Sequence, residues 1–212
     1  KEHLYLNQQN GTFKEVIKET TGHTSYFSMG NDIADFNNDR LIDFMSLDMM
    51  SEHNYDIKTS MSGMNPDRFY KHVNLGLHHQ YMYNTLQLNN GVNKETGTPM
   101  FSDIAQMAGV SSTDWSWAPL FFDMDNDGNK DLFISNGIKG DFRNNDFVNY
   151  QKKKQKEVLK LKSEGKPFDQ TTYINDILGK MPSRKKVNYF FKNNGDLTFS
   201  NKSLIWGGDL LS

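Results

Sequence analysis

The sequence predicts an all-β fold built from a repeated unit of short strands and interrupted by two mainly helical insertions. Three observations support this prediction: a pattern that recurs along the chain, short runs of aromatic and apolar residues, and Asn-Gly pairs behind those runs. An Asn-Gly pair favours the type I′ turn of a β-hairpin, because both central positions of that turn need a positive φ. Several short strands per unit with Gly and Asn turns are typical of the blades of a β-propeller.

The repeated unit occurs three times. The copies begin with strand-like runs such as Leu4–Leu6, followed by an Asn-Gly pair and a phenylalanine. Phe13 precedes Asp35 by 22 residues, Phe101 precedes Asp123 by the same 22 residues, and the two aspartates are 88 residues apart. The copies predict blades at about 1–51, 84–138 and 188–212 of one partial propeller domain. The third copy would place its acidic loop beyond residue 212, so we expect residues 1–212 to be a fragment of a longer array.

Two segments, at about 52–83 and 139–187, interrupt the repeat and carry helical patterns. In the first, Asn65-Pro66-Asp67 predicts a helix start, since Asn caps helices and Pro fits their first turn. In the second, Phe147–Lys162 predicts one helix, and a shorter one is expected around Tyr173–Leu178. Insertions of this kind project from one face of a repeat protein, and that face often binds partners.

The strongest chemical signal is the segment Asp123–Asp131, which reads DMDNDGNKD. Its spacing matches the first nine positions of an EF-hand calcium loop, with a glycine at the bend. Calcium takes six to eight hard oxygen ligands, and alternate residues of a tight loop converge on one point. A strand-like run follows in place of a helix, so the sequence predicts a Ca²⁺ loop between strands. The expected ligands are Asp123, Asp125, Asp127, the Asn129 carbonyl and Asp131.

The segment Asp35–Asp43 is a weaker copy of the same loop. Its expected ligands are Asp35, Asn37, Asp39, the Leu41 carbonyl and Asp43. Arg40 replaces the glycine, which strains the backbone at the bend and adds a positive charge beside the ion. A structural turn with a weak or empty site therefore stays open as the alternative for this loop.

At these residues the chain resembles FG-GAP/VCBS-repeat proteins, whose calcium-loop blades form β-propellers. The resemblance rests on Asn10–Phe13, the two acidic loops and the aromatic stretch Thr113–Ala118. More narrowly, Asn65–Tyr70 and Asn144–Val148 resemble insertions of bacterial relatives of cartilage acidic protein that carry an ASPIC/UnbV domain. This resemblance implies a secreted or surface-anchored binding protein, often found beside nutrient-uptake systems, rather than a catalyst.

Composition excludes several classes of function. The 212 residues include 24 Lys and Arg against 26 Asp and Glu, a net charge of −2, so we expect no nucleic-acid partner. No run of 18 apolar residues occurs, so no membrane-spanning helix is expected. There is no cysteine, which excludes a disulfide framework, a thiolate metal site and a cysteine nucleophile.

Four weaker candidates have plainer alternatives. Trp115 and Trp117 could stack on a sugar, but the repeat favours an apolar core face, on which Phe121 matches Ile33. Three histidines of the first insertion could bind zinc, but their helical spacing favours solvated or packing roles. A run of lysines could touch acidic lipid or polysaccharide, but a solvated helix face is favoured. Asp103 and Asp114 could pair as acid and base, and nothing in the sequence places them together. The histidines are His72, His78 and His79, and the lysines run from Lys152 to Lys162.

Together these observations predict a non-catalytic, calcium-binding module at the cell surface or outside the cell. The expected partner is a protein or glycan held through the insertions, and the resemblance also implies a link to an outer-membrane uptake complex. Two alternatives stay open. One is a structural subunit of an outer-membrane surface assembly, and the other is a metal-dependent hydrolase built on the acidic loops.

Overall fold

The computed structural model describes residues 2–60, 65–183 and 185–208. The chain forms two compact units. The first consists of Lys1–Glu52, Met64–Gly137 and Lys186–Ser212, and the second of His53–Gly63 and Ile138–Lys185. No helix among the described residues is both long enough and apolar enough to cross a membrane.

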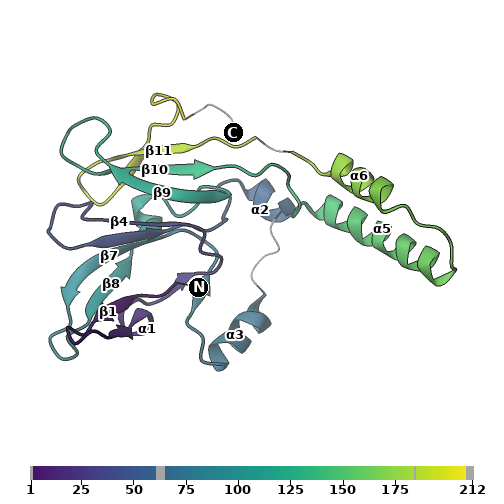
Figure 1. Ribbon diagram of the computed structural model, residues 1–212. Helices are drawn as coiled ribbons and strands as arrows, with labels where there is room; N and C mark the ends of the chain where they lie inside the picture. Colours follow the sequence, from purple (N-terminus) through teal and green to yellow (C-terminus); the bar gives the residue numbers. More distant parts are fainter. Residues whose placement is uncertain (1, 61–64, 184, 209–212) are drawn as a thin grey trace. The chain divides into compact units, whose positions relative to one another are not determined.

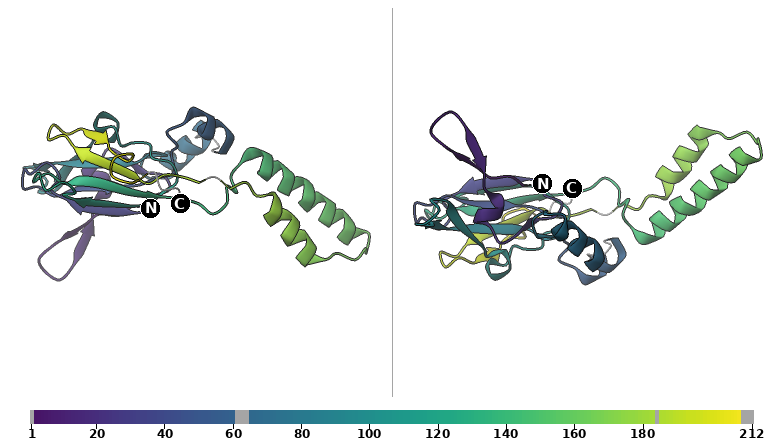
Figure 2. Two further views of the ribbon diagram at one scale, coloured as in Figure 1. Left: turned by 90° about the horizontal axis from the view of Figure 1, so that it is seen from above. Right: turned by 90° about the horizontal axis from the view of Figure 1, so that it is seen from below.

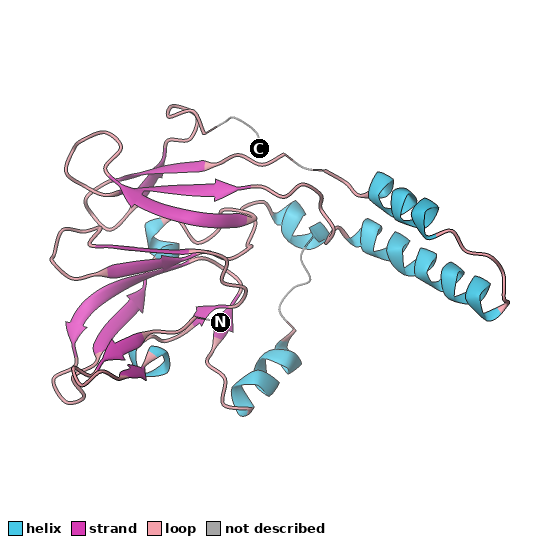
Figure 3. Ribbon diagram, in the orientation of Figure 1, coloured by secondary structure: helices cyan, strands magenta, loops and turns pink. Residues whose placement is uncertain are grey.

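The prediction of an all-β, partial β-propeller fold is wrong. The structure is mixed α/β, and helices and strands each make up 26% of it. Its strands form four small sheets, and the described residues show neither a propeller nor a closed barrel (Figure 3). The insertions account for most of the helical share, because segments such as Asn145–Ser163 are rich in Lys, Gln and Leu, which favour helices.

Two four-stranded antiparallel sheets, both in the first unit, carry the repeat (Figure 1). The strand order is β4-β5-β7-β8 in one sheet and β12-β11-β10-β9 in the other, so each is a simple meander. The bounds are β4 (Asn31–Ala34), β5 (Asp43–Ser46), β7 (Thr85–Val92), β8 (Pro99–Asp103), β9 (Ser116–Phe122), β10 (Asp131–Asn136), β11 (Tyr189–Asn193) and β12 (Phe199–Asn201). In both sheets an acidic loop joins the first strand to the second, and an insertion separates the second strand from the third.

The Asn-Gly pairs occupy different places in the three copies. Asn10-Gly11 lies between β1 (Tyr5–Asn7) and β2 (Phe13–Glu15), and Asn194-Gly195 lies between β11 and β12, as a hairpin turn requires. The second pair, Asn90-Gly91, lies inside β7, where the register shifts at a bulge. The hairpin turn there comes later, where the Asn93 amide donates to the Thr98 carbonyl (2.9 Å). Extra residues after the glycine therefore lengthen this hairpin.

Smaller elements complete the first unit. Strands β1 and β2 form an antiparallel hairpin, which stands off the sheets in both views of Figure 2. Strand β3 (Thr24–Ser25) pairs in parallel with β6 (Gln80–Tyr81). The helices of this unit are α1 (Ile17–Thr20), α3 (Pro66–Asn74) and α4 (Ala105–Ala108). Helix α3 begins as predicted, with Pro66 in its first turn and the Asn65 side chain accepting from the Arg68 amide.

One hydrophobic core joins the two larger sheets. Phe36 lies between Phe121 and Phe199, with ring centroids 6.1 Å and 5.8 Å away. All three rings are buried, as are Leu86 and Leu132. Burial of aromatic rings of this size contributes a large part of the stability of such a core. The packing fixes the two sheets against each other and brings their acidic loops to the same edge.

The second unit contains α2 (Asn54–Ser60), α5 (Asn145–Ser163) and α6 (Gln170–Lys180). The Asn144 side chain accepts from the amides of the first turn of α5, and the Asp169 carboxylate does the same for α6. Between the two helices, the Tyr150 hydroxyl donates to Asp176 (2.6 Å). The Lys154 ammonium also lies 3.2 Å from Asp176, so both of these contacts between α5 and α6 meet at this carboxylate.

The close approach of β9 to the residue before β4 predicts that any side chain at Gly30 destabilises the fold. A Cβ atom at Gly30 would lie 2.1 Å from the Trp117 carbonyl oxygen, which belongs to backbone and cannot turn away. We expect Gly30→Ala to lower the free energy of unfolding by about 1–3 kcal/mol, as overpacking does. Chemical denaturation measures this difference. Gly22→Ala is the matched control, because nothing lies within 4 Å of a Cβ at Gly22; equal stability of both variants with the wild type would contradict the packing described.

Candidate metal centre

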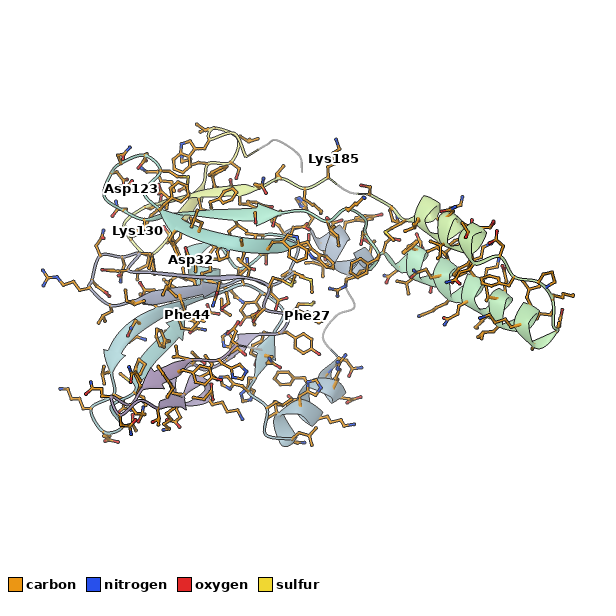
Figure 4. All side chains as sticks on the ribbon, viewed as in Figure 1. Phe27, Asp32, Phe44, Asp123, Lys130 and Lys185 are labelled. Atoms are coloured by element: carbon orange, nitrogen blue, oxygen red, sulfur yellow. The ribbon has the colours of Figure 1, made fainter. Side chains whose placement is uncertain are left out.

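The loop between β9 and β10 gathers three carboxylates. One oxygen each of Asp123, Asp125 and Asp131 lies within 4.8 Å of the others. Asp131 is the first residue of β10 and is fully buried, whereas Asp125 is exposed. Figure 4 labels Asp123 and Lys130 at this loop, at the end of the sheet. Carboxylate oxygens this close repel one another in the absence of a cation, and they are the ligands that Ca²⁺ prefers.

Backbone amides hold Asp123 and Asp131 of this loop in place. Asp123 accepts from the amides of Asp127 (3.0 Å) and Gly128 (2.9 Å). Asp131 accepts from the amides of Met124 (2.9 Å) and Asn193 (2.9 Å). Gly128 has a φ of 87°, which glycine adopts without strain. The sequence therefore fixes the loop by local hydrogen bonds, and Asp131 ties it to β11.

The loop between β4 and β5 has the same hydrogen-bond skeleton. Asp35 accepts from the amides of Asp39 (3.0 Å) and Arg40 (2.9 Å). Asp43 accepts from the amides of Phe36 (3.2 Å) and Asn89 (2.8 Å). Arg40 takes a φ of 71°, the same left-handed conformation as the glycine of the other loop. The arginine therefore adopts the required bend at a conformational cost.

The two loops differ in how their carboxylates lie. In the first loop the Asn37 amide group donates to Asp39 (2.9 Å), which draws these two side chains together. Within the described ranges, only the second loop brings three carboxylates close enough to share one ion. The amides of Leu41 and Asn129 donate to Asp39 (2.8 Å) and Asp127 (2.9 Å) respectively. All ten predicted ligand residues lie in these two loops, and the second loop has the closer cluster of carboxylates.

A lysine that the sequence analysis missed lies against the second loop. The Lys192 ammonium, on β11, contacts Asp125 and lies 2.8 Å from Asp127. The Lys192 contact holds the pKa of Asp127 below its usual value, and the two aspartates raise the pKa of Lys192. Asn193 and Asn89 occupy equivalent places, so Leu88 takes the place of Lys192 in the first sheet. Aligning the two Asn-Asn-Gly segments would have marked Lys192 as a difference between the copies, but not its contact with Asp125.

The tips of the two loops are near each other. The Asn38 side chain donates to the Gly128 carbonyl (3.2 Å) and to the Asn129 side chain (3.4 Å). Asn38 and Asn126 occupy equivalent bends, with φ values of 61° and 59°. The acidic loops therefore form one edge of the first unit rather than two separate features.

The tryptophan pair does not form the buried face that the repeat predicts. Trp117 is 47% exposed, and its indole nitrogen donates to the Gly137 carbonyl (2.5 Å). Phe121 is buried as expected, but its counterpart Ile33 is 66% exposed. The two residues have different surroundings. Phe121 packs against Phe36, which follows the first strand of the other sheet, whereas Ile33 lies at an open cleft.

The three histidines have separate structural roles. The sequence predicts that all three lie on one helix, but His78 and His79 lie beyond the end of α3. His78 Nε2 lies 3.1 Å from the Thr21 carbonyl oxygen, and burial lowers its pKa. His72 stacks on Tyr26 at 6.5 Å. In the part of the chain that the structure describes, no histidine belongs to a possible metal-ligand cluster.

Asp103 and Asp114 are engaged in different contacts. Asp103 lies 3.0 Å from His23 Nε2, which the Tyr83 hydroxyl also approaches at 3.0 Å. Asp114 contacts Lys186 (2.5 Å) and accepts from the Ser51 hydroxyl (3.0 Å). The His23 and Tyr83 contacts were not foreseen, because they join segments 60 to 80 residues apart.

The lysines of α5 are mostly exposed, as a solvated face requires. Lys154 is the exception, since it is partly buried and pairs with Asp176 (3.2 Å). Val158 and Leu161 are half-buried, whereas Leu159 is 60% exposed.

The buried Asp43 predicts a pH dependence of stability without calcium. Burial raises its pKa from 3.8 to about 6, against the hydrogen bonds from the Asn89 and Phe36 amides, and the nearby Asp39 and Asp35 raise it further. Between pH 4 and 6 the folded state binds more protons than the unfolded chain, so stability falls as pH rises through this window. We expect this loss to be about 1–3 kcal/mol.

Denaturation in a chelator at several pH values, for the wild type and Asp43→Asn, measures the effect. The wild type should lose stability relative to the variant as pH rises from 4 to 6. Exposed Asp67→Asn serves as the control and should show no such trend. A wild-type-minus-variant difference that is constant with pH would contradict the assignment to Asp43.

Comparison of the chain with protein-family models, with curated proteins and with solved structures gave no match. The resemblance to FG-GAP/VCBS-repeat proteins therefore rests on the sequence motifs alone.

Proposed function

We propose that this chain is a non-catalytic, calcium-binding module of a secreted or cell-surface bacterial protein. The observation that supports this most directly is the meeting of Asp123, Asp125 and Asp131 oxygens in a loop of calcium-ligand spacing. Backbone amides hold the Asp123 and Asp131 oxygens before any ion binds, which lowers the cost of ordering the site. Ca²⁺ suits the donor set, because all the ligands are hard oxygens and their number can reach six or more.

The second loop would hold the ion through Asp123, Asp125, Asp127, Asp131 and the Asn129 carbonyl. The first loop would use Asp35, Asn37, Asp39, Asp43 and the Leu41 carbonyl, with weaker affinity because it has one carboxylate fewer. Its Arg40 adds a positive charge near the ion, which lowers the affinity further.

The proposed role of the ion is structural. Asp131 contacts the amides of Met124 and Asn193, so an ion bound to it would link the loop to β10 and β11. A bound Ca²⁺ would also offset the repulsion among the clustered carboxylates. An extracellular module can use sites of modest affinity, because calcium outside cells is abundant enough to fill them.

A binding role is favoured over a catalytic one by the state of the other acidic groups. Asp103 pairs with His23 and Asp114 with Lys186, so each already has a structural partner. We propose that a protein or glycan at the cell surface binds to the insertions, as the resemblance to FG-GAP/VCBS-repeat relatives suggests.

Calcium titration of Asp125→Asn tests the proposal. Asp125 contacts Lys192 and no backbone amide among the described residues, so its replacement removes a ligand charge and leaves the loop skeleton intact. We expect wild-type unfolding to shift upward by about 2.7 kcal/mol at 100 times the dissociation constant. In Asp125→Asn the affinity should fall at least tenfold, while stability in chelator stays near that of the wild type.

Calorimetry and thermal melts with Ca²⁺, Mg²⁺ and chelator give both quantities. Exposed Glu95→Gln, which removes a carboxylate outside both loops, is the control. A wild type whose calorimetric trace and melting temperature ignore calcium would refute the proposed function.

Lys192→Met tests the competition between a tethered cation and the ion. Removing the ammonium leaves Asp125 and Asp127 free to face calcium, so we expect calcium affinity to rise severalfold at low salt. Lys130→Met removes a charge from the same loop without a described carboxylate contact. Equal tightening in both variants would show a general charge effect and exclude direct competition by Lys192.

A further inference from the structure

A cleft in the first unit lies apart from the acidic cluster of the second loop. It has a volume of about 590 Å³ and lies between the N-terminal segment with its β1–β2 hairpin and the neighbouring part of the β4-β5-β7-β8 sheet. Figure 4 labels Phe44, on the sheet side of this region. A cleft of this volume matches the sites that hold small organic molecules.

The walls of the cleft are largely apolar and aromatic. Phe44 and Phe101 meet edge to face with centroids 5.0 Å apart, and Tyr5 lies on the hairpin side. Ile33 and Ile42 also line the cleft and are more than half exposed. Apolar surface left open in this way favours a ligand with an apolar body.

One carboxylate oxygen in this lining lacks a partner. Glu2 Oε1 accepts from the Ser28 hydroxyl (2.6 Å) and the Ser25 amide (3.2 Å). Glu2 Oε2 is buried and makes no hydrogen bond to the described residues, although the Ser46 hydroxyl lies near enough to the carboxylate to lower its pKa. Leaving a buried carboxylate oxygen unsatisfied costs free energy, and a donor supplied by a ligand would recover it. Burial also raises the pKa of Glu2, which the Ser28 and Ser25 hydrogen bonds only partly offset.

The charges around the cleft have one sign. Glu2 and Asp43 line it, and no Lys or Arg does so among the described residues. His3, which also lines the cleft, lies 3.9 Å from Glu15. A cationic ligand is therefore complementary, and the aromatic rings add to this, because their faces attract ammonium groups.

We propose that this cleft binds a small organic ammonium ion with an apolar or aromatic body. The N–H donor of the ligand bonds to Glu2 Oε2, and its apolar part packs against Phe44 and Phe101. The binding contacts are those of Glu2, Phe44 and Phe101. Because Asp43 lines the cleft and is also an expected ligand of the first acidic loop, the affinity is measured with and without calcium.

The test uses 2-phenylethylamine as the probe and 2-phenylethanol as its neutral counterpart, on the full 212-residue chain, both with calcium and with chelator. Calorimetry gives the affinities, and NMR follows the ring protons of Phe44 and Phe101. We expect the amine to bind at least tenfold more tightly than the alcohol and to shift these ring signals. Equal affinities, no binding of the amine, or shifts confined to other residues would overturn the proposal.

Glu2→Gln isolates the carboxylate. The amide oxygen can still accept from Ser28 and Ser25, so the variant removes the charge and keeps the anchoring hydrogen bonds. Its amine affinity should fall at least tenfold while its alcohol affinity is unchanged. Glu19→Gln is the matched control, because Glu19 is an exposed carboxylate near the same hairpin that pairs only with Lys14 among the described residues.

Glu19→Gln should bind the amine as the wild type does. An equal loss in both variants would indicate a general charge effect and overturn the proposal. If Glu2→Gln does not fold, the ratio of amine to alcohol affinity in the unaltered protein still decides the question.

Discussion

Two buried carboxylates, Asp43 and Asp131, are the constraint on which the rest of the first unit depends. Each begins the second strand of its sheet and has no exposed surface. A buried charge is tolerated only when hydrogen bonds surround it, and each accepts one amide from its own loop and one from the third strand. The register of three strands and the course of the acidic loop are therefore set by one side chain in each sheet. The core of Phe36, Phe121 and Phe199 then packs the two sheets together.

The two acidic loops share one backbone conformation but differ in the charges around their carboxylates. Both use a left-handed residue at the bend, Arg40 in one and Gly128 in the other, and both hold their first aspartate by two amides. What differs is the neighbouring strand, which brings Lys192 to the second loop and Leu88 to the corresponding place in the first. The loop with more clustered negative charge is thus the one whose carboxylates pair with a lysine of the neighbouring strand.

Local features were predictable from the sequence, and features that depend on distant contacts were not. The acidic loops and the start of α3 are governed by hydrogen bonds within a few residues, so spacing and capping rules identified them. The approach of Lys192 to Asp125 spans 67 residues, and the pairing of His23 with Asp103 spans 80 residues. The fold class was wrong for another reason: the strand repeat is real, but helices make up as much of the chain as strands do, and most of them lie in the insertions. Ile33 shows that a repeat position does not determine burial. It occupies the same repeat position as the buried Phe121, but its exposure depends on which segments pack on that face of the sheet.

The place of the insertions affects the order in which the sheets can form. In each sheet the first two strands are joined by a short acidic loop, so their hairpin closes over a few residues at little cost in chain entropy. The third strand joins only after 38 residues in one sheet, from Ser46 to Thr85, and 52 in the other, from Asn136 to Tyr189. Contacts of such long range slow folding. We therefore expect the hairpins that carry the acidic loops to form early, and the hydrogen bonds from the Asn89 and Asn193 amides to Asp43 and Asp131 to form late. In this unit, each sheet is completed when its third strand joins and buries the aspartate that begins its second strand.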